Sequence, residues 1–457
     1  MKVNGRGSKV SPARAAAFDI LLRVERESSY ASELLHSRTY TSLTIADHSL
    51  ATELVMGVLR WRALLDLWIA ESSSQALAKL DLEILIALRL ALYQLRYLDR
   101  IPAHAAINES VELVKRARKR SAASFVNAVL RKLAAVAIDT PPLSEVTSVE
   151  KLAVYSATPP WLVGRWFENY GSEAAREICQ YNQSVPSTAI RLRHPDTENR
   201  LRAEGIELVP GAFLASARRV TGGDITKTAA FRSGLCVVQD EASQLVAALV
   251  GTGQRVLDCC AAPGGKTLVM ADRNPGAKIT AIDFHLHRAR LLRKLTLVSN
   301  SEALEEGQID VVAADARNLP FSVKFDRVLA DVPCSGTGTF ARNPEIKWRL
   351  KRDDLIELQT RQIAILRSAM AQVRDGGRVV YSTCSLEREE NEDVVEKALA
   401  EEPSFRLMNC GIELQRLQGE GELIPSKSFS LTRGSYLRTL PGIHPCDGFF
   451  AAILEKT

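Results

Sequence analysis

The chain has 457 residues, 46% of them hydrophobic and 25% charged, with a formal net charge of +5. This length exceeds what one core ordinarily supports, so we expect two or three domains. No stretch approaches the roughly 20 uncharged apolar residues of a membrane helix, and residues 1–16 lack a secretory apolar segment. The composition therefore excludes a disordered or membrane-embedded chain and predicts a cytoplasmic protein, which we expect to be a monomer without a membrane partner.

The eight cysteines show no structural framework. They are scattered, with no C-x-x-C pair and no histidine at zinc-ligand spacing. We therefore expect neither disulfides nor a metal site.

The first part of the chain is predicted to be helical. Residues 11 to about 136 place apolar side chains at helical spacing, after a Ser11 cap with Pro12 in the first turn. The segments "SLATELVMGVLRWRALLDLWIA" and "LEILIALRLALYQLRYL" are so apolar that they must be central helices of a bundle. We predict an all-α domain over residues 1–140.

This helical segment carries the excess positive charge. Residues 1–140 hold 20 Lys and Arg against 14 Asp and Glu, which leaves the rest of the chain near −1. The densest basic run is Lys115, Arg116, Arg118, Lys119 and Arg120. Such a run is either a solvated helix end or a patch that binds nucleic-acid phosphates.

A small connecting subdomain is predicted over residues 146–235, after a proline-bearing boundary at residues 138–145. "PPWLVGRWFENYGSEAAREICQYN" has a helical pattern. The short runs "TAIRLR", "GIELVPGAF" and "ARRVTGG" are strand-like. This mixture indicates an α+β fold.

The pattern changes again over residues 236–457. "RVLDCC", "KITAID", "DVVAAD", "DRVLAD" and "GRVVYSTC" are short buried-strand runs, several of which end in an acid or a thiol. Helical segments separate most of them, which is typical of a doubly wound parallel sheet. Such sheets bind ligands at the carboxyl ends of their strands. The last run, "GFFAAILEKT", is expected to pair at the sheet edge.

The segment "RVLDCCAAPGGKT" has the pattern of a strand, a glycine turn and a helix start. It matches neither G-x-G-x-x-G nor the P-loop G-x-x-x-x-G-K-[ST], because position 260 is a cysteine. Gly264 and Gly265 instead let the backbone approach a ligand at a helix N-terminus, where amides favour a carboxylate.

Two acids follow this turn in order. Asp283 ends "KITAID", where a carboxylate can accept both hydroxyls of a ribose, and Asp315 ends "DVVAAD", in position for an adenine amino group. A single Asp at a strand end is usually a helix cap or turn former. Two of them after a glycine turn favour an adenosine-type ligand, and without a phosphate loop S-adenosyl-L-methionine fits better than NAD or ATP.

Two thiols stand at two predicted strand exits, Cys334 in "VLADVPCSGTGT" and Cys384 in "VVYSTCSLEREENE". Cysteine often packs simply as a small hydrophobe. Asp331 and Cys334 lie in Asp-Val-Pro-Cys, however, where methyltransferases acting on exocyclic amines carry an aromatic ring in place of the sulfur. This substitution favours attack on carbon.

Methylation of C5 of a pyrimidine requires such a thiol. A thiolate that adds to C6 makes C5 enamine-like, so that C5 can accept the methyl group. A base then removes the C5 proton, and the thiolate leaves. Nearby cations or helix N-termini should lower the pKa of the attacking thiol. Spacing and strand context alone leave Cys334 and Cys384 as equal candidates.

The motifs "LDCCAAPGGKT", "DVPCSGTGTFARNPEIKW", "YSTCSLEREENE" and "DGFFAAILEK", in this order, resemble the RNA cytosine-C5 methyltransferases of the NOL1/NOP2/Sun family. The resemblance implies that Cys384 is the nucleophile, that Cys334 assists elimination, and that Asp331 contacts the cytosine. It also implies S-adenosyl-L-methionine as cofactor, held by Cys260, Ala261, Ala262, Pro263, Gly264, Gly265, Lys266, Asp283, Asp315 and Asp331.

The N-terminal segments "LATELVMGVLRWRALLD", "ALYQLRYLDRIPAHAAINESVELVK" and "FVNAVLRKL" are similar to the NusB-like RNA-binding domain of bacterial small-subunit rRNA methyltransferases of this family. The implied substrate is one cytosine of 16S ribosomal RNA, in the helix 31 loop. We expect modification on naked or partly assembled RNA, because a flipped base needs access.

Some features leave alternatives open. Residues 340–344 read Phe-Ala-Arg-Asn-Pro where family members often carry two arginines and His-Pro, which puts the contacts of this segment with phosphate or base in doubt. Glu389, Glu390 and Asn391 are compatible with a plain helix start. Two other functions fit the same motifs: the same reaction on another RNA such as tRNA, or a catalytically silent RNA-binding assembly factor.

Overall fold

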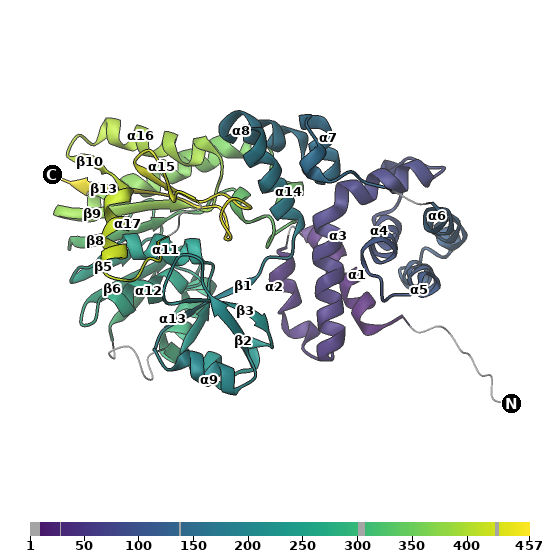
Figure 1. Ribbon diagram of the computed structural model, residues 1–457, viewed down its shortest axis with the longest axis horizontal. Helices are drawn as coiled ribbons and strands as arrows, with labels where there is room; N and C mark the ends of the chain where they lie inside the picture. Colours follow the sequence, from purple (N-terminus) through teal and green to yellow (C-terminus); the bar gives the residue numbers. More distant parts are fainter. Residues whose placement is uncertain (1–9, 28, 137–138, 300–306, 426–428) are drawn as a thin grey trace. The chain divides into compact units, whose positions relative to one another are not determined.

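The computed structural model describes residues 10–27, 29–136, 139–299, 307–425 and 429–457. Its contacts divide the chain into two compact units (Figure 1). The helical unit comprises residues 1–185 and 340–349, and the sheet unit comprises residues 186–339 and 350–457. The three predicted domains, 1–140, 146–235 and 236–457, stay a prediction. The two contact-based units have other boundaries, because they divide the predicted middle segment at residue 185 and place residues 340–349 in the helical unit.

The helical unit is built, over its described residues, from these helices: α1 (Pro12–Glu27), α2 (Ala31–Leu35), α3 (Ile45–Ser72), α4 (Leu82–Tyr97), α5 (Ala103–Arg116), α6 (Ala123–Ala135), α7 (Val149–Tyr155), α8 (Pro160–Gln183) and α14 (Ile346–Arg349). The two most apolar predicted segments form α3 and α4, and both contribute many side chains to one core. Buried Arg89 of α4 donates to both carboxylate oxygens of Asp66 of α3 at 2.7 Å. The all-α prediction for this part of the chain is confirmed.

The helix predicted after the Pro159-Pro160 pair is α8. It begins at Pro160, whose fixed φ and missing N–H suit the first turn of a helix. It is kinked at Gly171, whose φ of 86° lies in the left-handed region. Trp166 of this helix is fully buried and lies beside Phe340, with ring centroids 6.1 Å apart.

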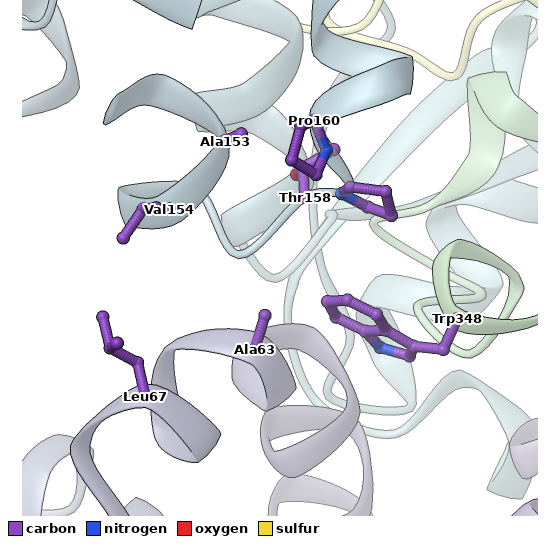
Figure 2. Close-up of a pocket in the computed structure, with 8 residues that line it drawn as sticks. Ala63, Leu67, Ala153, Val154, Thr158, Pro160 and Trp348 are labelled. Carbon is purple, nitrogen blue, oxygen red and sulfur yellow. The ribbon is translucent and has the colours of Figure 1, made fainter. Parts of the chain in front are cut away.

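The helical unit contains a pocket of about 310 Å³ lined by Ala63, Leu67, Ala153, Val154, Thr158, Pro159, Pro160 and Trp348. Figure 2 shows Leu67 of α3 and Val154 of α7 pointing toward one another across it, with the Trp348 indole along one side. Residues of the early helices, of the α7–α8 region and of the segment 340–349 therefore meet within this unit.

The sheet unit contains a small antiparallel sheet in its first part. Its strands are β1 (Thr188–Leu192), β2 (Glu207–Pro210), β3 (Ala217–Gly222) and β4 (Cys236–Val238), in the order β2-β3-β1-β4. The short helices α9 (Thr197–Ala203) and α10 (Ala229–Arg232) accompany it. The strand-like runs predicted in the middle region are β1, β2 and β3.

The larger sheet has the strand order β11-β12-β13-β9-β8-β5-β6-β7, with β10 also paired to β13. Its strands are β5 (Arg255–Asp258), β6 (Lys278–Asp283), β7 (Ile309–Ala313), β8 (Phe325–Asp331), β9 (Val373–Thr383), β10 (Phe405–Met408), β11 (Thr432–Arg433), β12 (Tyr436–Arg438) and β13 (Phe450–Lys456). Strands β5 to β9 pair in parallel. The predicted doubly wound sheet is confirmed.

Helices cover both faces of this sheet, as the labelled helices in Figure 1 show. Neighbouring strand residues enter different cores, as the two-residue period of a strand requires: Leu329 and Val380 belong to one core, Val328 and Val379 to the other. The first core includes residues of α11 (Glu241–Leu249), α12 (Gly265–Arg273) and α17 (Cys410–Gly419). The second includes residues of α15 (Asp354–Gln372) and α16 (Glu392–Glu401).

The position expected for the last strand is wrong. β13 pairs antiparallel with β9, but its other side is also paired, by β12 and β10. It therefore lies inside the sheet, which fits its nearly continuous burial. The length and apolarity needed to cross a membrane are not found in any helix of the described residues.

Candidate active site

Polar residues, several of them predicted for the site, lie at or just beyond the carboxyl ends of parallel strands. Asp258 ends β5, Asp283 ends β6, and Asp331 ends β8. Cys384 directly follows β9. Strand β5 pairs with β6 on one side and β8 on the other, so the strand order reverses there. Ligand sites of doubly wound sheets lie at such a switch point.

The loop after β5 turns sharply into α12, whose first residue is Gly265. Gly264 precedes it with a φ of 116°, and a Cβ placed there would lie 2.6 Å from Leu292 Cδ1. Glycine is therefore favoured by the backbone conformation, and any larger residue would also displace the Leu292 side chain. The backbone nitrogen of Ala261 donates to the carbonyl of Ile282 at 2.7 Å, which joins this loop to β6.

Asp258 is a residue of this site that the sequence analysis missed. It is 1% exposed, and the Thr267 hydroxyl donates to its Oδ2 at 2.7 Å, which ties α12 to the end of β5. Burial raises the pKa of Asp258 to about 7. Its position at the end of "RVLD" is the same signal that singled out Asp283.

Asp283 and Asp315 differ in their surroundings. Asp283 is buried and accepts a hydrogen bond from the backbone nitrogen of His285 at 2.8 Å. Asp315 lies two residues beyond the end of β7 and is paired with Arg317 at 2.6 Å, which holds the pKa of its carboxyl below the usual value. A ligand amine at Asp315 would have to compete with Arg317.

Lys266 connects the cofactor loop to the Asp-Val-Pro-Cys motif. Its Nζ lies 2.8 Å from Asp331 Oδ2 and 5.0 Å from the centre of the Phe449 ring. The Ser382 hydroxyl donates to the other oxygen of Asp331 at 2.7 Å. Burial lowers the pKa of Lys266, but the Asp331 carboxylate outweighs it and the net shift is upward. The lysine therefore carries its charge at neutral pH.

The two predicted cysteines meet. Cys334 Sγ and Cys384 Sγ are 3.3 Å apart, and both thiols are free and half-buried. A disulfide needs about 2.05 Å, so this distance is a contact between thiols. The hydrogen bond with Cys384, together with burial, raises the pKa of Cys334 well above the usual thiol value. The two thiols are thus hydrogen-bonded neighbours.

Glu390 is the residue that the sequence analysis misjudged. Its position fits a solvated helix start, but its side chain is 0% exposed. Its Oε1 accepts from the backbone nitrogen of Ser335 at 2.8 Å and from Gln362 Nε2 at 2.9 Å. Its Oε2 accepts from the hydroxyls of Ser335 and Ser385. Each serine directly follows one of the two cysteines, so one carboxylate joins both cysteine loops.

Backbone contacts reinforce this junction. The nitrogen of Gly338 donates to the carbonyl of Cys384 at 2.9 Å, and the nitrogen of Gly448 donates to the carbonyl of Gly338 at 2.8 Å. A Cβ at Gly338 would lie 2.2 Å from the Gly448 carbonyl oxygen, so only glycine fits where these two backbone segments meet. The loop that follows Cys334 is therefore fixed to the loop that carries Cys384.

The segment that departs from the family pattern lies in the helical unit. Phe340 and Ala341 are buried there, and Arg60 of α3 donates to the carbonyl of Ala341 at 3.1 Å. Buried Lys347 donates to the carbonyls of Arg60 and Ala157, each at 2.9 Å. These contacts assign the described part of this segment a packing role.

Further hydrogen bonds hold the same segment. Trp348 Nε1 donates to the carbonyl of Leu59 at 2.7 Å. Glu345 Oε1 accepts from the backbone nitrogen of Ala31, the first residue of α2, at 2.9 Å.

The basic run on the helical unit is largely neutralised by acids of the same unit. Lys115 pairs with Glu112, Arg116 with Asp19, and Lys119 with Asp81, at 2.7–2.9 Å. These pairs support the interpretation of this run as a solvated surface. In the part of the chain that the structure describes, no three His, Cys, Asp or Glu side chains are grouped so that they could hold a metal ion.

A doubly wound sheet with a glycine turn after its first parallel strand, acids at the next strand ends and free cysteines at the switch point defines a class of nucleic-acid methyltransferases. The family model "16S rRNA methyltransferase RsmB/F" matches residues 248–455, and the NusB family model matches residues 11–135. The chain belongs to the family of ribosomal RNA small subunit methyltransferase B, as its relatives show, and is thus an S-adenosyl-L-methionine-dependent rRNA methyltransferase.

Two such relatives illustrate the likeness. The "Probable ribosomal RNA small subunit methyltransferase B" of Bacillus subtilis is 33% identical, with 98% of this chain and 99% of the relative aligned. The "Ribosomal RNA small subunit methyltransferase B" of Vibrio cholerae is also 33% identical, over 90% of each chain. The predicted family is therefore confirmed.

Solved structures share the fold. The crystal structure of the protein PH0851 superposes with a TM-score of 0.77 at 24% identity, covering 98% of this chain and 99% of that chain. A methyltransferase homologue from Pyrococcus horikoshii has a TM-score of 0.55 at 25% identity, covering 68% of this chain and all of the other.

Proposed function

We propose that this protein methylates C5 of one cytosine in 16S ribosomal RNA through a covalent bond between Cys384 and C6 of the base. The observation that carries the proposal is the pair of free thiols 3.3 Å apart, beside the Lys266–Asp331 ion pair at the switch point of the sheet. A reaction that needs both an addition and an elimination has use for two groups at one carbon–carbon bond. When bound, S-adenosyl-L-methionine supplies the methyl group.

The proposed cofactor contacts are those that the motifs imply. The fit is chemical: amides at the start of α12 suit a carboxylate, and buried Asp283 suits the hydroxyls of a ribose. Residues Cys260 to Lys266 form the turn that approaches the ligand, and Asp315 would contact the adenine once Arg317 yields.

The protein groups act in sequence on the cytosine. The Cys384 thiolate forms a bond to C6, and the C5–C6 π electrons become available at C5, assisted by Asp331 at the base. After C5 has formed its bond to the methyl carbon, a base removes the C5 proton. The electron pair of that C–H bond forms the C5–C6 double bond as the C6–S bond breaks, and its electrons leave with sulfur as the Cys384 thiolate. Cys334 assists this elimination.

The target is inferred from the relatives. Their printed names specify the small ribosomal subunit, and the matching family model specifies 16S rRNA. We propose a cytosine in the helix 31 loop, on RNA that is naked or partly assembled, because the base must leave its stack to reach a thiol in the sheet. The NusB-family segment over residues 11–135 would contribute RNA binding.

Bisulfite sequencing of ribosomal and transfer RNA from a strain lacking the gene tests the target. We expect one 5-methylcytosine of 16S rRNA to disappear and to return when the wild-type gene is restored. Persistence of every 5-methylcytosine in 16S rRNA would show that the assigned target is wrong. Loss of a tRNA site instead would keep the chemistry and change the substrate.

Adduct formation tests the roles of the two cysteines. We expect Cys384→Ala to abolish the covalent protein–RNA adduct and Cys334→Ala to retain or accumulate it. Denaturing gel electrophoresis of each variant with 16S rRNA and S-adenosyl-L-methionine measures the adduct. The opposite pattern would exchange the roles. An adduct that neither substitution changes would show that neither cysteine forms it, and no adduct in either the wild-type protein or Cys334→Ala would contradict the covalent mechanism.

A further inference from the structure

The two cysteines at the switch point form a pair of adjacent free thiols. Cys334 Sγ and Cys384 Sγ lie 3.3 Å apart, and both side chains are half-buried. The other cysteines are buried, apart from half-buried Cys260. The contact places this pair within reach of a disulfide bond without one being present.

The loops that carry the two thiols are fixed to one another. The Glu390 carboxylate accepts hydrogen bonds from the hydroxyls of Ser335 and Ser385, which directly follow the two cysteines. These two hydroxyl oxygens are also in contact, at 3.0 Å. The backbone nitrogen of Gly338 donates to the carbonyl of Cys384 at 2.9 Å. A reaction between the two sulfurs is therefore intramolecular, which favours it strongly over reaction with a second molecule.

The chemistry proposed for Cys384 also exposes it to oxidants. If a cytosine base reaches this sulfur, hydrogen peroxide can enter by the same route, because it is much smaller than a base. The thiolate that attacks carbon is also the form of cysteine that attacks a peroxide. Cysteines that sense oxidants combine a reactive, accessible thiol with a neighbouring thiol that completes the disulfide. The switch point of the sheet holds both components.

We propose that Cys334 and Cys384 are a redox-modification site: a hydroperoxide converts them into a disulfide, which removes the nucleophile, and a dithiol reductant restores it. The formation of the disulfide concerns the free protein. The accompanying loss of methyl transfer rests on the proposed function, because it requires that Cys384 attacks the base.

The oxidation proceeds in two steps. The Cys384 thiolate attacks one oxygen of hydrogen peroxide, the O–O bond breaks, and the second oxygen leaves as hydroxide, so that Cys384 becomes a sulfenic acid. The Cys334 thiol then gives up its proton and its sulfur attacks the sulfur of Cys384. The S–O bond breaks, and hydroxide leaves and takes up the proton as water. The two thiols lose two electrons in total, and the peroxide gains them.

Peptide mass spectrometry of the full-length protein measures the modification without RNA or cofactor. The reduced protein is treated briefly with hydrogen peroxide, the remaining free thiols are blocked with N-ethylmaleimide, and the protein is digested with trypsin. Trypsin releases Cys334 in the peptide 328–342 and Cys384 in the peptide 379–388, each without a second cysteine. We expect these two peptides to appear as one cross-linked species that dithiothreitol separates.

Two variants make the assignment specific. In Cys334→Ala, the sulfenic acid of Cys384 has no neighbouring thiol, and we expect its further oxidation to the sulfinic acid, which dithiothreitol does not reverse. Cys260→Ala is the matched control, because it removes the other half-buried thiol and leaves the pair intact. The yield of the cross-linked species should not change in this control.

The same oxidised samples report the consequence for methyl transfer. We expect transfer from S-adenosyl-L-methionine to 16S rRNA to fall by at least about tenfold when the cross-link is complete, because a sulfur in a disulfide cannot form the bond to C6. Treatment with dithiothreitol should restore the activity.

The outcomes separate this inference from the proposed function. Sulfinic acid at Cys384 of the wild-type protein without a cross-link, a cross-link to Cys260 instead, or two thiols that stay reduced would each overturn the modification site. A complete cross-link with unchanged methyl transfer would overturn both the switch and the role of Cys384 as nucleophile. Failure to find the expected 5-methylcytosine would change the assigned target and leave the cross-linking result standing.

Discussion

The segments that follow the two cysteines behave differently. After Cys384, the chain stays in the sheet unit and passes through the turn η7 (Arg388–Glu390) into α16, burying Glu390 within six residues. After Cys334, the chain leaves the sheet unit at Thr339, contributes residues 340–349 to the helical unit, and returns at Leu350. One thiol is thus anchored by its own sheet, whereas the other is followed closely by a segment whose packing belongs to a different unit.

The two segments meet at Gly338, and replacing this glycine should have the largest effect. In Gly338→Ala, the new Cβ would lie 2.2 Å from the Gly448 carbonyl oxygen, and backbone cannot move aside as a side chain can. We expect a loss of about 3 kcal/mol in the free energy of unfolding, at the upper end of the range for overpacking. Urea denaturation measures it.

The matched control is Gly419→Ala, where the added Cβ meets nothing within 4 Å and the residue lies at the end of α17. It should be neutral or slightly stabilising, because alanine restricts the unfolded chain. Equal stability of Gly338→Ala and Gly419→Ala would show that the two cysteine loops are not held together at this point.

The packing of residues 340–349 is tested by Lys347→Met. The variant leaves the carbonyls of Arg60 and Ala157 without their donor, and we expect a loss of about 2 kcal/mol at pH 9. Burial lowers the pKa of Lys347 to about 7, below its usual value of 10.5. Between these values the unfolded chain binds more protons, so the wild-type protein gains stability as pH rises.

The difference in unfolding free energy between wild type and Lys347→Met should therefore grow from pH 6 to pH 9, measured by urea denaturation at each pH. Lys351→Met, at an exposed position just beyond the segment, is the control and should show no such trend. A constant difference across this range would mean that Lys347 is not buried as a neutral amine.

The bridge between the segments is tested by Gln362→Met. The variant preserves the volume but removes the amide that joins the Pro333 carbonyl to Glu390. We expect a loss of about 1–2 kcal/mol of stability and a lower rate of adduct release. Stopped-time adduct assays together with thermal unfolding measure the two effects. If Gln362→Met is less stable but releases the RNA adduct at the wild-type rate, the Gln362 hydrogen bonds do not support the action of Cys334 in adduct release.

The smallest effect is expected at Arg388, which lies in the segment after Cys384 but is exposed. It pairs with Asp393 at 2.7 Å and with Glu396, and surface pairs of this kind contribute little. Arg388→Ala should change the free energy of unfolding by less than about 0.5 kcal/mol, measured by urea denaturation. A large effect would show that the whole "EREENE" stretch, and not Glu390 alone, supports the site.

The sheet and the main site residues could be predicted because their signals are local. Short apolar runs that end in Asp258, Asp283 or Asp331 are strands followed by polar turns, whatever the rest of the chain does. The placement of Cys334 and Cys384 at one edge of the sheet follows from the rule that parallel strands present their carboxyl ends there; their contact at 3.3 Å is seen only in the structure. The individual roles of the proposed cofactor-binding residues stay predictions.

Other features depend on contacts that no local pattern encodes. Glu390 and Lys347 are charged residues in polar stretches, for which exposure is the ordinary expectation. Both are buried because partners far away in the sequence complete their hydrogen bonds: Ser335 lies 55 residues from Glu390, and Arg60 lies 287 residues from Lys347.

The sequence by itself thus determined the fold class, the family and the positions of the two cysteines at strand ends, because alternating apolar runs and short motifs are properties of neighbouring residues. The tertiary structure decided which buried carboxylate joins the two cysteine loops and where the segment after Cys334 packs. Burial of a charge is stable only when distant groups supply its partners, and those groups are brought together by the fold alone.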